Sequence, residues 1–323
     1  MYKRQGKGSE VHVVDITADF VKISNLTIRN SRKSSWWDSG IWLDSSNVNI
    51  TNCHFTNTMI GVYGEGASDV TISNCISHHN NNMGFSLMYG NNNSIINCTA
   101  YNNPYKGIRI YGKNNEVEDC TVYNNWDGLR IEHCLNSIFS NNTLSNNRVG
   151  VKLLYSDNNV IRGNLIKSNW EVGIWTIEPS YNNLIYHNNI INNNRNSKDS
   201  YTNIWDNSYP SGGNYWSDYN GEDNYHGSNQ DIPGSDGIGD TPYSIAGGGN
   251  QDRYPLMQPY GLNQPPVANF TYYPDNPSST DVVHFIDSSN DSDGYIVSWW
   301  WDFGDGYFSN LQNPMHCLSL IHI

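Results

Sequence analysis

The stretch YKGIRIYGKNNEVEDCTVYNNWDG, residues 105–128, decides the fold because it holds one full period of a repeat. Gly107 opens a run of alternating apolar residues, and Gly128 opens the next run. Outward from this stretch, the same signal recurs every 21 to 23 residues, at Gly40, Gly61, Gly84, Gly107, Gly128, Gly150 and Gly173. Each alternating run of three to five residues predicts a short strand.

A second landmark follows each glycine after about thirteen or fourteen residues, at Cys53, Cys75, Cys98, Cys120, Asn142, Asn164 and Asn188. One apolar row lies three residues before this landmark, and a mostly apolar row lies two residues after it. The two rows are five residues apart, so strict alternation breaks once, which predicts a corner between two short strands. The chain holds 50 asparagines. Asparagine tolerates left-handed corners and can hydrogen-bond its copy in the next repeat.

A period of about 22 residues leaves no room for a helix, and Asn-rich corners disfavour one. The short strands therefore stack coil on coil as parallel strands, at ~4.8 Å per coil. The alternation predicts which side chains fill the interior: Ile41, Leu43, Phe85, Leu87, Ile108, Ile110, Leu129, Ile131, Val151, Leu153 and Ile174.

These repeats resemble the NosD-type and related carbohydrate-binding and sugar-hydrolysis repeats over residues 11–196. The resemblance implies an all-β chain built on a right-handed parallel β-helix of the pectin-lyase-like fold. It says less about chemistry, because that family includes lyases, hydrolases, epimerases and non-catalytic proteins.

The composition divides the rest of the chain. We expect the β-helix over residues 6–200 and a cap over residues 201–262, where the period gives way to aromatic, Gly and Asp residues that resemble the closing block of NosD-like proteins. Residues 263–266 form a Pro-containing linker. The string WDFGDG at 301–306 resembles the signature of PKD domains, which implies a partial Ig-like β-sandwich over residues 267–316. Residues 1–5 and 317–323 resemble sequencing-adapter read-through and are expected to be non-native ends.

The charge balance limits the partners. Eighteen Lys and Arg residues stand against 31 Asp and Glu residues, so the formal net charge is −13, which opposes binding to nucleic acid. No apolar run approaches the ~20 residues of a membrane span. The resemblance to envelope proteins, in which PKD domains act as spacers, implies an extracellular, cell-surface or periplasmic protein. We expect a monomer with a polysaccharide or surface glycan as its partner.

The second residue after each glycine is expected to face solvent, in a row that reads Trp42, Tyr63, Ser86, Arg109, Arg130, Lys152 and Trp175. Three hypotheses explain this row. In the first, which we favour, it binds glycan through Trp42, Tyr63, Arg109, Arg130, Lys152 and Trp175, together with Trp126 and Tyr105. In the second, Glu132 or Asp127 acts as acid or base with Arg130, as in a polysaccharide lyase, hydrolase or epimerase. In the third, the cations only pair with Glu132, Asp127 and Glu118 on a solvated face.

Metal sites are the last candidates. The four stacked cysteines are read as buried thiols, as disulfides between coils, or as ligands of copper, a metal that the NosD resemblance raises. The scattered histidines argue against copper. Asp231, Asp236 and Asp240 in a Gly-rich segment offer hard oxygen ligands for calcium, with Asp-Gly turns that need no metal as the alternative.

Overall fold

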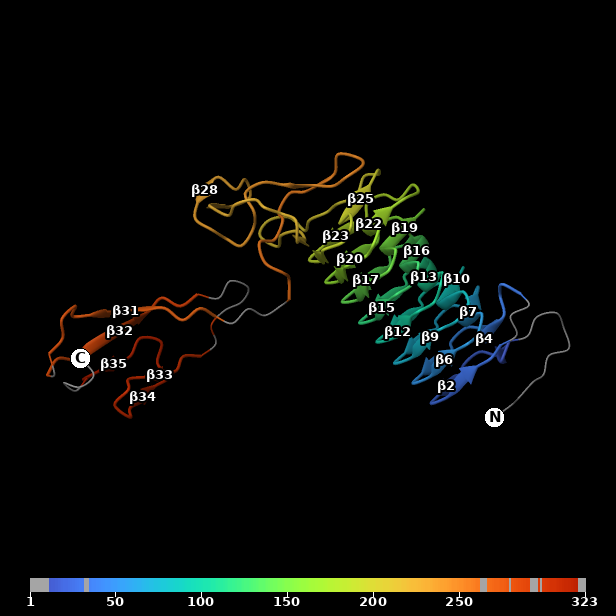
Figure 1. The fold of residues 1–323 in the computed structure, drawn as a ribbon, viewed down its shortest axis with the longest axis horizontal. Coiled ribbons are helices and arrows are strands. Elements are labelled where there is room, and N and C mark those ends of the chain that lie inside the picture. Colours follow the sequence, from blue (N-terminus) through green and yellow to red (C-terminus); the bar gives the residue numbers. More distant parts are fainter. Residues whose placement is uncertain are drawn as a thin grey trace. The chain divides into compact units, whose positions relative to one another are not determined.

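The computed structural model describes residues 12–31, 35–261, 266–278, 280–290, 296 and 298–318. The expected non-native residues 1–5, and residues 319–323 at the other end, lie outside this part of the chain. The chain divides into two compact units, Met1–Tyr260 and Gly261–Ile323 (Figure 1). Every regular element in the described residues is a strand, as the all-β prediction requires.

The first unit is a stack of coils whose strands form three parallel sheets (Figure 1). Sheet A contains β1 (Val14–Ile16), β4 (Ser39–Leu43), β7 (Ile60–Glu65), β10 (Met83–Met88), β13 (Lys106–Lys113), β16 (Asp127–Leu135), β19 (Val149–Leu154), β22 (Val172–Thr176) and β25 (Ser197–Asp199). Sheet B contains β2 (Lys22–Ser24), β5 (Asn49–Thr51), β8 (Thr71–Ser73), β11 (Ser94–Ile96), β14 (Glu116–Glu118), β17 (Ile138–Ser140), β20 (Val160–Arg162) and β23 (Leu184–Tyr186). Sheet C contains β3 (Thr27–Arg29), β6 (His54–Thr56), β9 (Ile76–His78), β12 (Thr99–Tyr101), β15 (Thr121–Tyr123), β18 (Thr143–Ser145), β21 (Leu165–Lys167), β24 (Asn189–Ile191) and β26 (Tyr215–Trp216).

The parallel β-helix expected from the repeat is therefore confirmed, and so is the register of its rows. Each strand pairs with the strand one coil away, as in Ile108 opposite Leu129 and Leu129 opposite Val151. The predicted interior residues are buried, with exposures of 0 or 1%. The predicted break in alternation separates sheet B from sheet C, for example between β5 and β6, with Asn52 at φ 52° in the corner.

Asparagine has two separate roles in these corners. Asn141 takes left-handed backbone angles (φ 57°) and is exposed, whereas the next residue, Asn142, is buried. Asn142 donates to Asn164 Oδ1 in the next coil at 3.0 Å, and its own Oδ1 accepts from the backbone N–H of Cys120 at 2.9 Å. The buried amides thus satisfy backbone groups that the corner leaves without a strand partner.

The cysteines occupy the same buried column as Asn142. Cys53, Cys75, Cys98 and Cys120 are free thiols, and the sulfur of each of the last three accepts a backbone N–H from the preceding coil, at 3.3 to 3.5 Å. The interpretation as stacked buried thiols is confirmed, and no disulfide links these coils.

The repeat glycines let the coils approach closely. At Gly150, a Cβ atom would lie 2.7 Å from the carbonyl oxygen of Gly173 and 2.8 Å from a methyl group of Ile166. A side chain at this position would push the next coil away, so the position requires glycine.

The chain after β25 closes the end of the stack. Strands β27 (Tyr225–His226) and β28 (Ile232–Pro233) form one antiparallel pair, and β29 (Tyr243–Ser244) and β30 (Gln251–Asp252) form another. Buried carboxylates hold this region to the coils: Asp252 accepts the indole N–H of Trp216 at 2.8 Å, and Asp199 accepts that of Trp205 at 3.0 Å. The indole rings of Trp205 and Trp216 lie 5.8 Å apart.

The second unit holds two small antiparallel sheets. One contains β31 (Phe270–Tyr273), β32 (Val283–Asp287) and β35 (Met315–His316), and the other contains β33 (Trp301–Asp302) and β34 (Phe308–Ser309). The rings of Phe270 and Phe285 both contact Trp301, with centroid distances of 5.3 and 5.7 Å. Across the residues described in both units, no helix is long and apolar enough to cross a membrane.

The buried amide column makes a stability prediction. Asn164→Ala removes the Oδ1 atom that accepts a hydrogen bond from the Asn142 amide. It also removes the Nδ2 group that donates to Phe139 O and Asn188 Oδ1, and so leaves buried polar groups unpaired. We expect a loss of about 1–3 kcal/mol for each group left unpaired, measured by urea unfolding. The control is Asn81→Ala, at an exposed position. Equal midpoints for the two variants would contradict the role of the column.

Candidate functional site

The cations predicted to stack on successive coils do form a single column on sheet A. The strand register places Trp42, Tyr63, Ser86, Arg109, Arg130, Lys152 and Trp175 side by side, and Lys198 on β25 extends the column. These side chains lie on the outer face of the sheet, opposite the alternating interior residues.

The expectation that the whole column faces solvent is wrong at three positions. Tyr63 is 2% exposed, Lys152 is 8% exposed, and Ser86 is buried. Tyr63 is covered because Trp37 and Trp42 pack on its ring, with centroids 5.1 and 4.8 Å away. One large neighbour in the same column and one outside it thus cover the ring, and Tyr63 offers little surface to a ligand.

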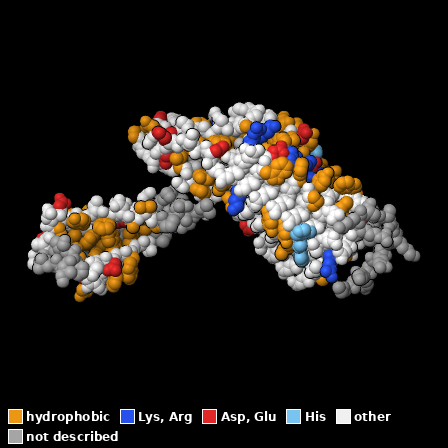
Figure 2. Space-filling view, in the orientation of Figure 1, with side chains coloured by type: hydrophobic (Ala, Val, Ile, Leu, Met, Phe, Trp, Pro, Cys, Tyr) orange, Lys and Arg blue, Asp and Glu red, His pale blue; other side chains and the backbone are white. Residues whose placement is uncertain are grey.

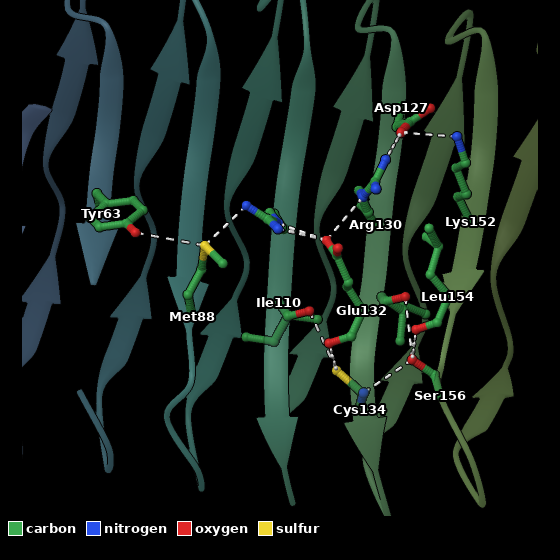
Figure 3. A network of polar contacts seen from close by, with 12 residues as sticks. Tyr63, Met88, Ile110, Asp127, Arg130, Glu132, Cys134, Lys152, Leu154 and Ser156 are labelled. Atoms are coloured by element: carbon green, nitrogen blue, oxygen red, sulfur yellow. Dashed lines mark hydrogen bonds and ion pairs between the residues drawn. The ribbon is translucent and has the colours of Figure 1, made fainter. Parts of the chain in front are cut away.

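An ion-pair network joins the central cations (Figure 3). Glu132 Oε2 lies 2.8 Å from Arg109 Nη2 and 3.1 Å from Arg130 Nε. Asp127 Oδ2 lies 3.1 Å from Arg130 Nη1 and 3.7 Å from Lys152 Nζ. Two carboxylates on β16 therefore relieve the repulsion between three stacked cations.

The predicted pairing with Glu118 is wrong. Glu118 belongs to β14 of sheet B, and its Oε1 accepts the hydroxyl of Ser140 at 3.1 Å. It lies on a different sheet from the cation column, so the counter-charges come from β16 alone.

The network sets the ionisation of its members. Burial alone would raise the pKa of Glu132, but Arg109 and Arg130 lower it below its usual value. Burial, with Arg130 and Arg109 nearby, lowers the pKa of Lys106 to about 8. Glu132 is thus a carboxylate at neutral pH, which suits an acceptor of hydrogen bonds rather than a general acid.

Exposed aromatic side chains border the amino-terminal ends of the sheet A strands. This first border consists of Trp36, Trp37, Tyr105, Trp126 and Trp170. Trp126 is 48% exposed and Trp170 is 54% exposed, with their rings 5.6 Å apart. Arg148 lies over the ring of Trp126 at 4.7 Å. Figure 2 shows hydrophobic side chains on the surface of the stack next to charged ones.

A second border runs along the carboxyl-terminal side of the same strands. It consists of Tyr89, Tyr111, His133 and Tyr155, whose successive ring centroids lie 4.4, 4.8 and 4.8 Å apart. Tyr89, His133 and Tyr155 have positive φ angles of 59°, 49° and 50°. Bulky residues rarely adopt this conformation, and the ring stacking offsets part of its cost.

A pocket of about 300 Å³ lies where the column ends. It is lined by Glu171, Val172, Trp175, Asn194, Arg195 and Lys198. Three cations surround the ring of Trp175: Lys198 Nζ at 4.9 Å, Lys152 Nζ at 5.4 Å and the Arg148 guanidinium carbon at 5.8 Å.

Three histidines gather on sheet C. His54 Nε2 lies 2.5 Å from His78 Nε2, and His78 Nδ1 lies 2.6 Å from His79 Nδ1. The ring of His78 also stacks on Tyr101 at 4.7 Å. Burial, with His54 and His79 beside it, lowers the pKa of His78.

The residues proposed for calcium do not gather. The Asp240 side chain accepts hydrogen bonds from the backbone N–H groups of Asn224 and Tyr225. The Asp236 side chain accepts one from the backbone N–H of Ile238 and one from the side-chain amide of Gln230. Over the residues that the structure describes, no three His, Cys, Asp or Glu side chains are placed to hold one metal ion. Asp231, Asp236 and Asp240 thus form no common ligand set.

The sequence reasoning identified Tyr105 and Trp126 but missed the rest of the first border and the terminal cations Arg148, Arg195 and Lys198. Trp37 and Trp170 each stand three residues before a repeat glycine, close to the offset of Tyr105 and Trp126. A search for aromatic residues two or three positions before each repeat glycine would have found Trp37 and Trp170.

Comparison with protein families gives two matches. A model described as periplasmic copper-binding protein (NosD) matches residues 7–154 and 44–221, and a PKD domain model matches residues 263–318. No curated protein matches the chain.

Several solved structures are similar to part of the chain. Pectate lyase Pel9A matches with 17% identity and a TM-score of 0.48, over 67% of this chain and 62% of its own. The periplasmic alginate epimerase AlgG matches with 14% identity and a TM-score of 0.48, over 51% and 46% of the two chains. The Azotobacter vinelandii mannuronan C-5 epimerase AlgE6 A-module matches with 16% identity and a TM-score of 0.46, over 64% and 72%. This chain thus spans less than two thirds of Pel9A and of AlgG.

The histidine cluster makes a pH prediction. The folded pKa of His78 is lowered, so its contribution to stability is complete above the unfolded pKa of about 6.5 and is lost as pH falls below it. We expect the urea midpoint to fall between pH 7 and pH 5, and to fall less in His78→Phe, which keeps the ring on Tyr101. His226→Phe, on β27, serves as the control. The same pH dependence in wild type and His78→Phe would show that the cluster does not cause it.

Proposed function

The chain belongs to the NosD family, and we propose that it binds a polysaccharide through the outer face of sheet A. The observation that carries the proposal is the pair of aromatic borders on either side of the polar column. Aromatic rings supply flat apolar surface, and the charged side chains between them supply hydrogen bonds to hydroxyl groups.

The stacked coils suit such binding because they hold the side chains in place before a ligand arrives. Ion pairs and hydrogen bonds fix Arg109, Arg130 and Glu132 to one another. Little side-chain freedom then remains to be lost on binding, which favours affinity. The stack also presents the same face along several coils, as a long chain molecule requires.

A carbohydrate-active enzyme is the alternative for this face. Glycoside hydrolysis by acid–base catalysis needs a carboxylic acid with a raised pKa beside a second carboxylate. Glu132 has a lowered pKa and contacts two arginines, and Asp127 contacts Arg130 and Lys152. These contacts favour binding over turnover, and the PKD domain then serves as a spacer in a secreted, cell-surface or periplasmic protein.

Copper is the ligand named in the family description, and the donors in the described part of the chain do not fit a copper centre as they lie. The thiols of the cysteine column are buried, and hydrogen bonding to neighbouring cysteines together with burial raises the pKa of Cys53, while burial raises that of Cys134 to about 12. A thiolate, the form that binds metal, is therefore disfavoured. The three histidines offer imidazole donors, but their ring nitrogens contact one another directly.

The aromatic border makes a binding prediction. Replacing an interfacial aromatic anchor by alanine costs about 1–2 kcal/mol or more, so we expect Trp126→Ala and Trp170→Ala each to weaken polysaccharide binding about 5- to 30-fold. A glycan array identifies the ligand, and calorimetry measures its Kd. Tyr225→Ala, an exposed aromatic on β27 rather than on sheet A, is the control.

Three outcomes are informative. Binding that depends on Trp126 and Trp170 supports the proposal, whereas no binding to any polysaccharide refutes it. Release of oligosaccharide products that stops in Glu132→Gln would instead establish an enzyme.

A second measurement distinguishes a copper-associated function from polysaccharide binding. We expect less than one equivalent of copper per chain to remain after dialysis, because no described donor set converges on one ion. One retained equivalent that is lost in His54→Ala and His78→Ala, but not in His226→Ala, would establish a copper-associated function instead.

A further inference from the structure

Charge is distributed unevenly along the outer face of sheet A. From β13 to β25, beside the cation column and at the amino-terminal ends of its strands, lie seven cations, Lys106, Arg109, Arg130, Arg148, Lys152, Arg195 and Lys198, and three carboxylates, Asp127, Glu132 and Glu171. This is a local surplus of four positive charges on a chain whose net charge is −13. A surplus of this kind attracts anions, and the two ends of the face differ in how much of it is available.

The central cations are already paired. Arg109 and Arg130 share Glu132, while Arg130 and Lys152 share Asp127 (Figure 3). Beyond β16 the columns that held these carboxylates become apolar, with Val149 and Val172 in register with Asp127, and Leu154 in register with Glu132. The carboxylates that pair with the cation column therefore end at β16.

The terminal cations lie beyond the reach of these carboxylates. Lys198 on β25 is three strands after β16, about 14 Å along the stack at ~4.8 Å per strand. That distance exceeds the Debye length of about 8–10 Å at physiological salt. Within the described part of the chain, neither Arg195 nor Lys198 has an ion pair, and the one carboxylate of the pocket, Glu171, is bound by Arg148 Nε at 2.5 Å.

The pocket pairs these two cations with an aromatic platform. Trp175 is part-exposed and lines the pocket of about 300 Å³ together with Arg195 and Lys198. This volume is at the lower end of small-ligand sites. An indole face accepts the apolar side of a sugar ring, and guanidinium and ammonium groups accept a carboxylate.

We propose that this pocket binds a carboxylate-bearing sugar unit of an acidic polysaccharide, held on Trp175 with its carboxylate between Arg195 and Lys198. This inference rests on the proposed function and adds the chemical class of the ligand. The central network then faces the hydroxyl groups of neighbouring units, because Arg109, Arg130 and Lys152 already contact carboxylates. Acidic chains are thus selected at one end of the face only.

The test compares a polyuronate oligosaccharide with the same oligosaccharide after reduction of its carboxyl groups to alcohols. We expect the acidic form to bind at least tenfold more tightly, and Arg195→Ala/Lys198→Ala to remove this preference by weakening the acidic form much more than the neutral form. The control is Lys113→Ala/Lys167→Ala, which removes equal charge at exposed positions outside the pocket. A sulfated oligosaccharide shows whether the pocket accepts sulfate as well.

The outcomes separate the inference from the function that it rests on. Equal binding of the acidic and neutral forms, lost in Trp126→Ala, would overturn the carboxylate pocket and leave polysaccharide binding intact. The same loss of preference in both double variants would also overturn it, because net charge rather than the pocket would then be responsible. Failure of every oligosaccharide to bind would overturn both proposals.

Discussion

Parallel stacking of the coils is the constraint on which the rest of the structure depends. Each residue lies ~4.8 Å from its counterpart in the coils before and after it, so every position belongs to a column. A column is stable only if its members tolerate one another at that distance. Glycine columns do so because no Cβ intervenes, and Asn and Cys columns do so because each side chain accepts a backbone N–H from the preceding coil. A column of cations cannot, and it therefore needs carboxylates in the adjacent columns, which Asp127 and Glu132 provide.

The same constraint explains why so much of the fold could be predicted from the sequence. A residue pattern that is weak evidence in one repeat recurs in the next repeats. The glycine, cysteine and apolar rows therefore predict both the period and the interior residues, such as Ile108 and Leu129. The sequence does not predict in this way which asparagines take the exposed left-handed corner position and which are buried. Asn141 and Asn142 are adjacent and chemically identical, yet one is exposed at φ 57° and the other is buried. The difference lies in a backbone angle that the residue type does not specify.

For the candidate site, the sequence predicts which residues align in one column, but not which side chains of neighbouring columns cover or pair with them. The register correctly aligned Arg109, Arg130 and Lys152, because alignment follows from the period alone. Exposure depends on side chains in neighbouring columns and in the corners, and the sequence does not show how far those side chains reach. Tyr63 is therefore buried beneath Trp37, and Glu118, close in sequence to the cations, serves a different sheet. The first aromatic border was only half recognised for a related reason, since Trp37 and Trp170 stand one residue further from the glycine than Tyr105 and Trp126.

Ion pairing across columns also has a consequence for function. Carboxylates on β16 pair with Arg109, Arg130 and Lys152 on β13, β16 and β19, and the columns of β22 and β25 hold no acidic residue at those positions. Among the described residues, Arg195 and Lys198, which lie where the stack ends beside Trp175, have no carboxylate partner. A stack of near-identical coils would otherwise offer a ligand many equivalent positions along its length. Because the two carboxylates lie on β16, one of these positions differs from the others in its unpaired cations. A long acidic chain would therefore be held in one register.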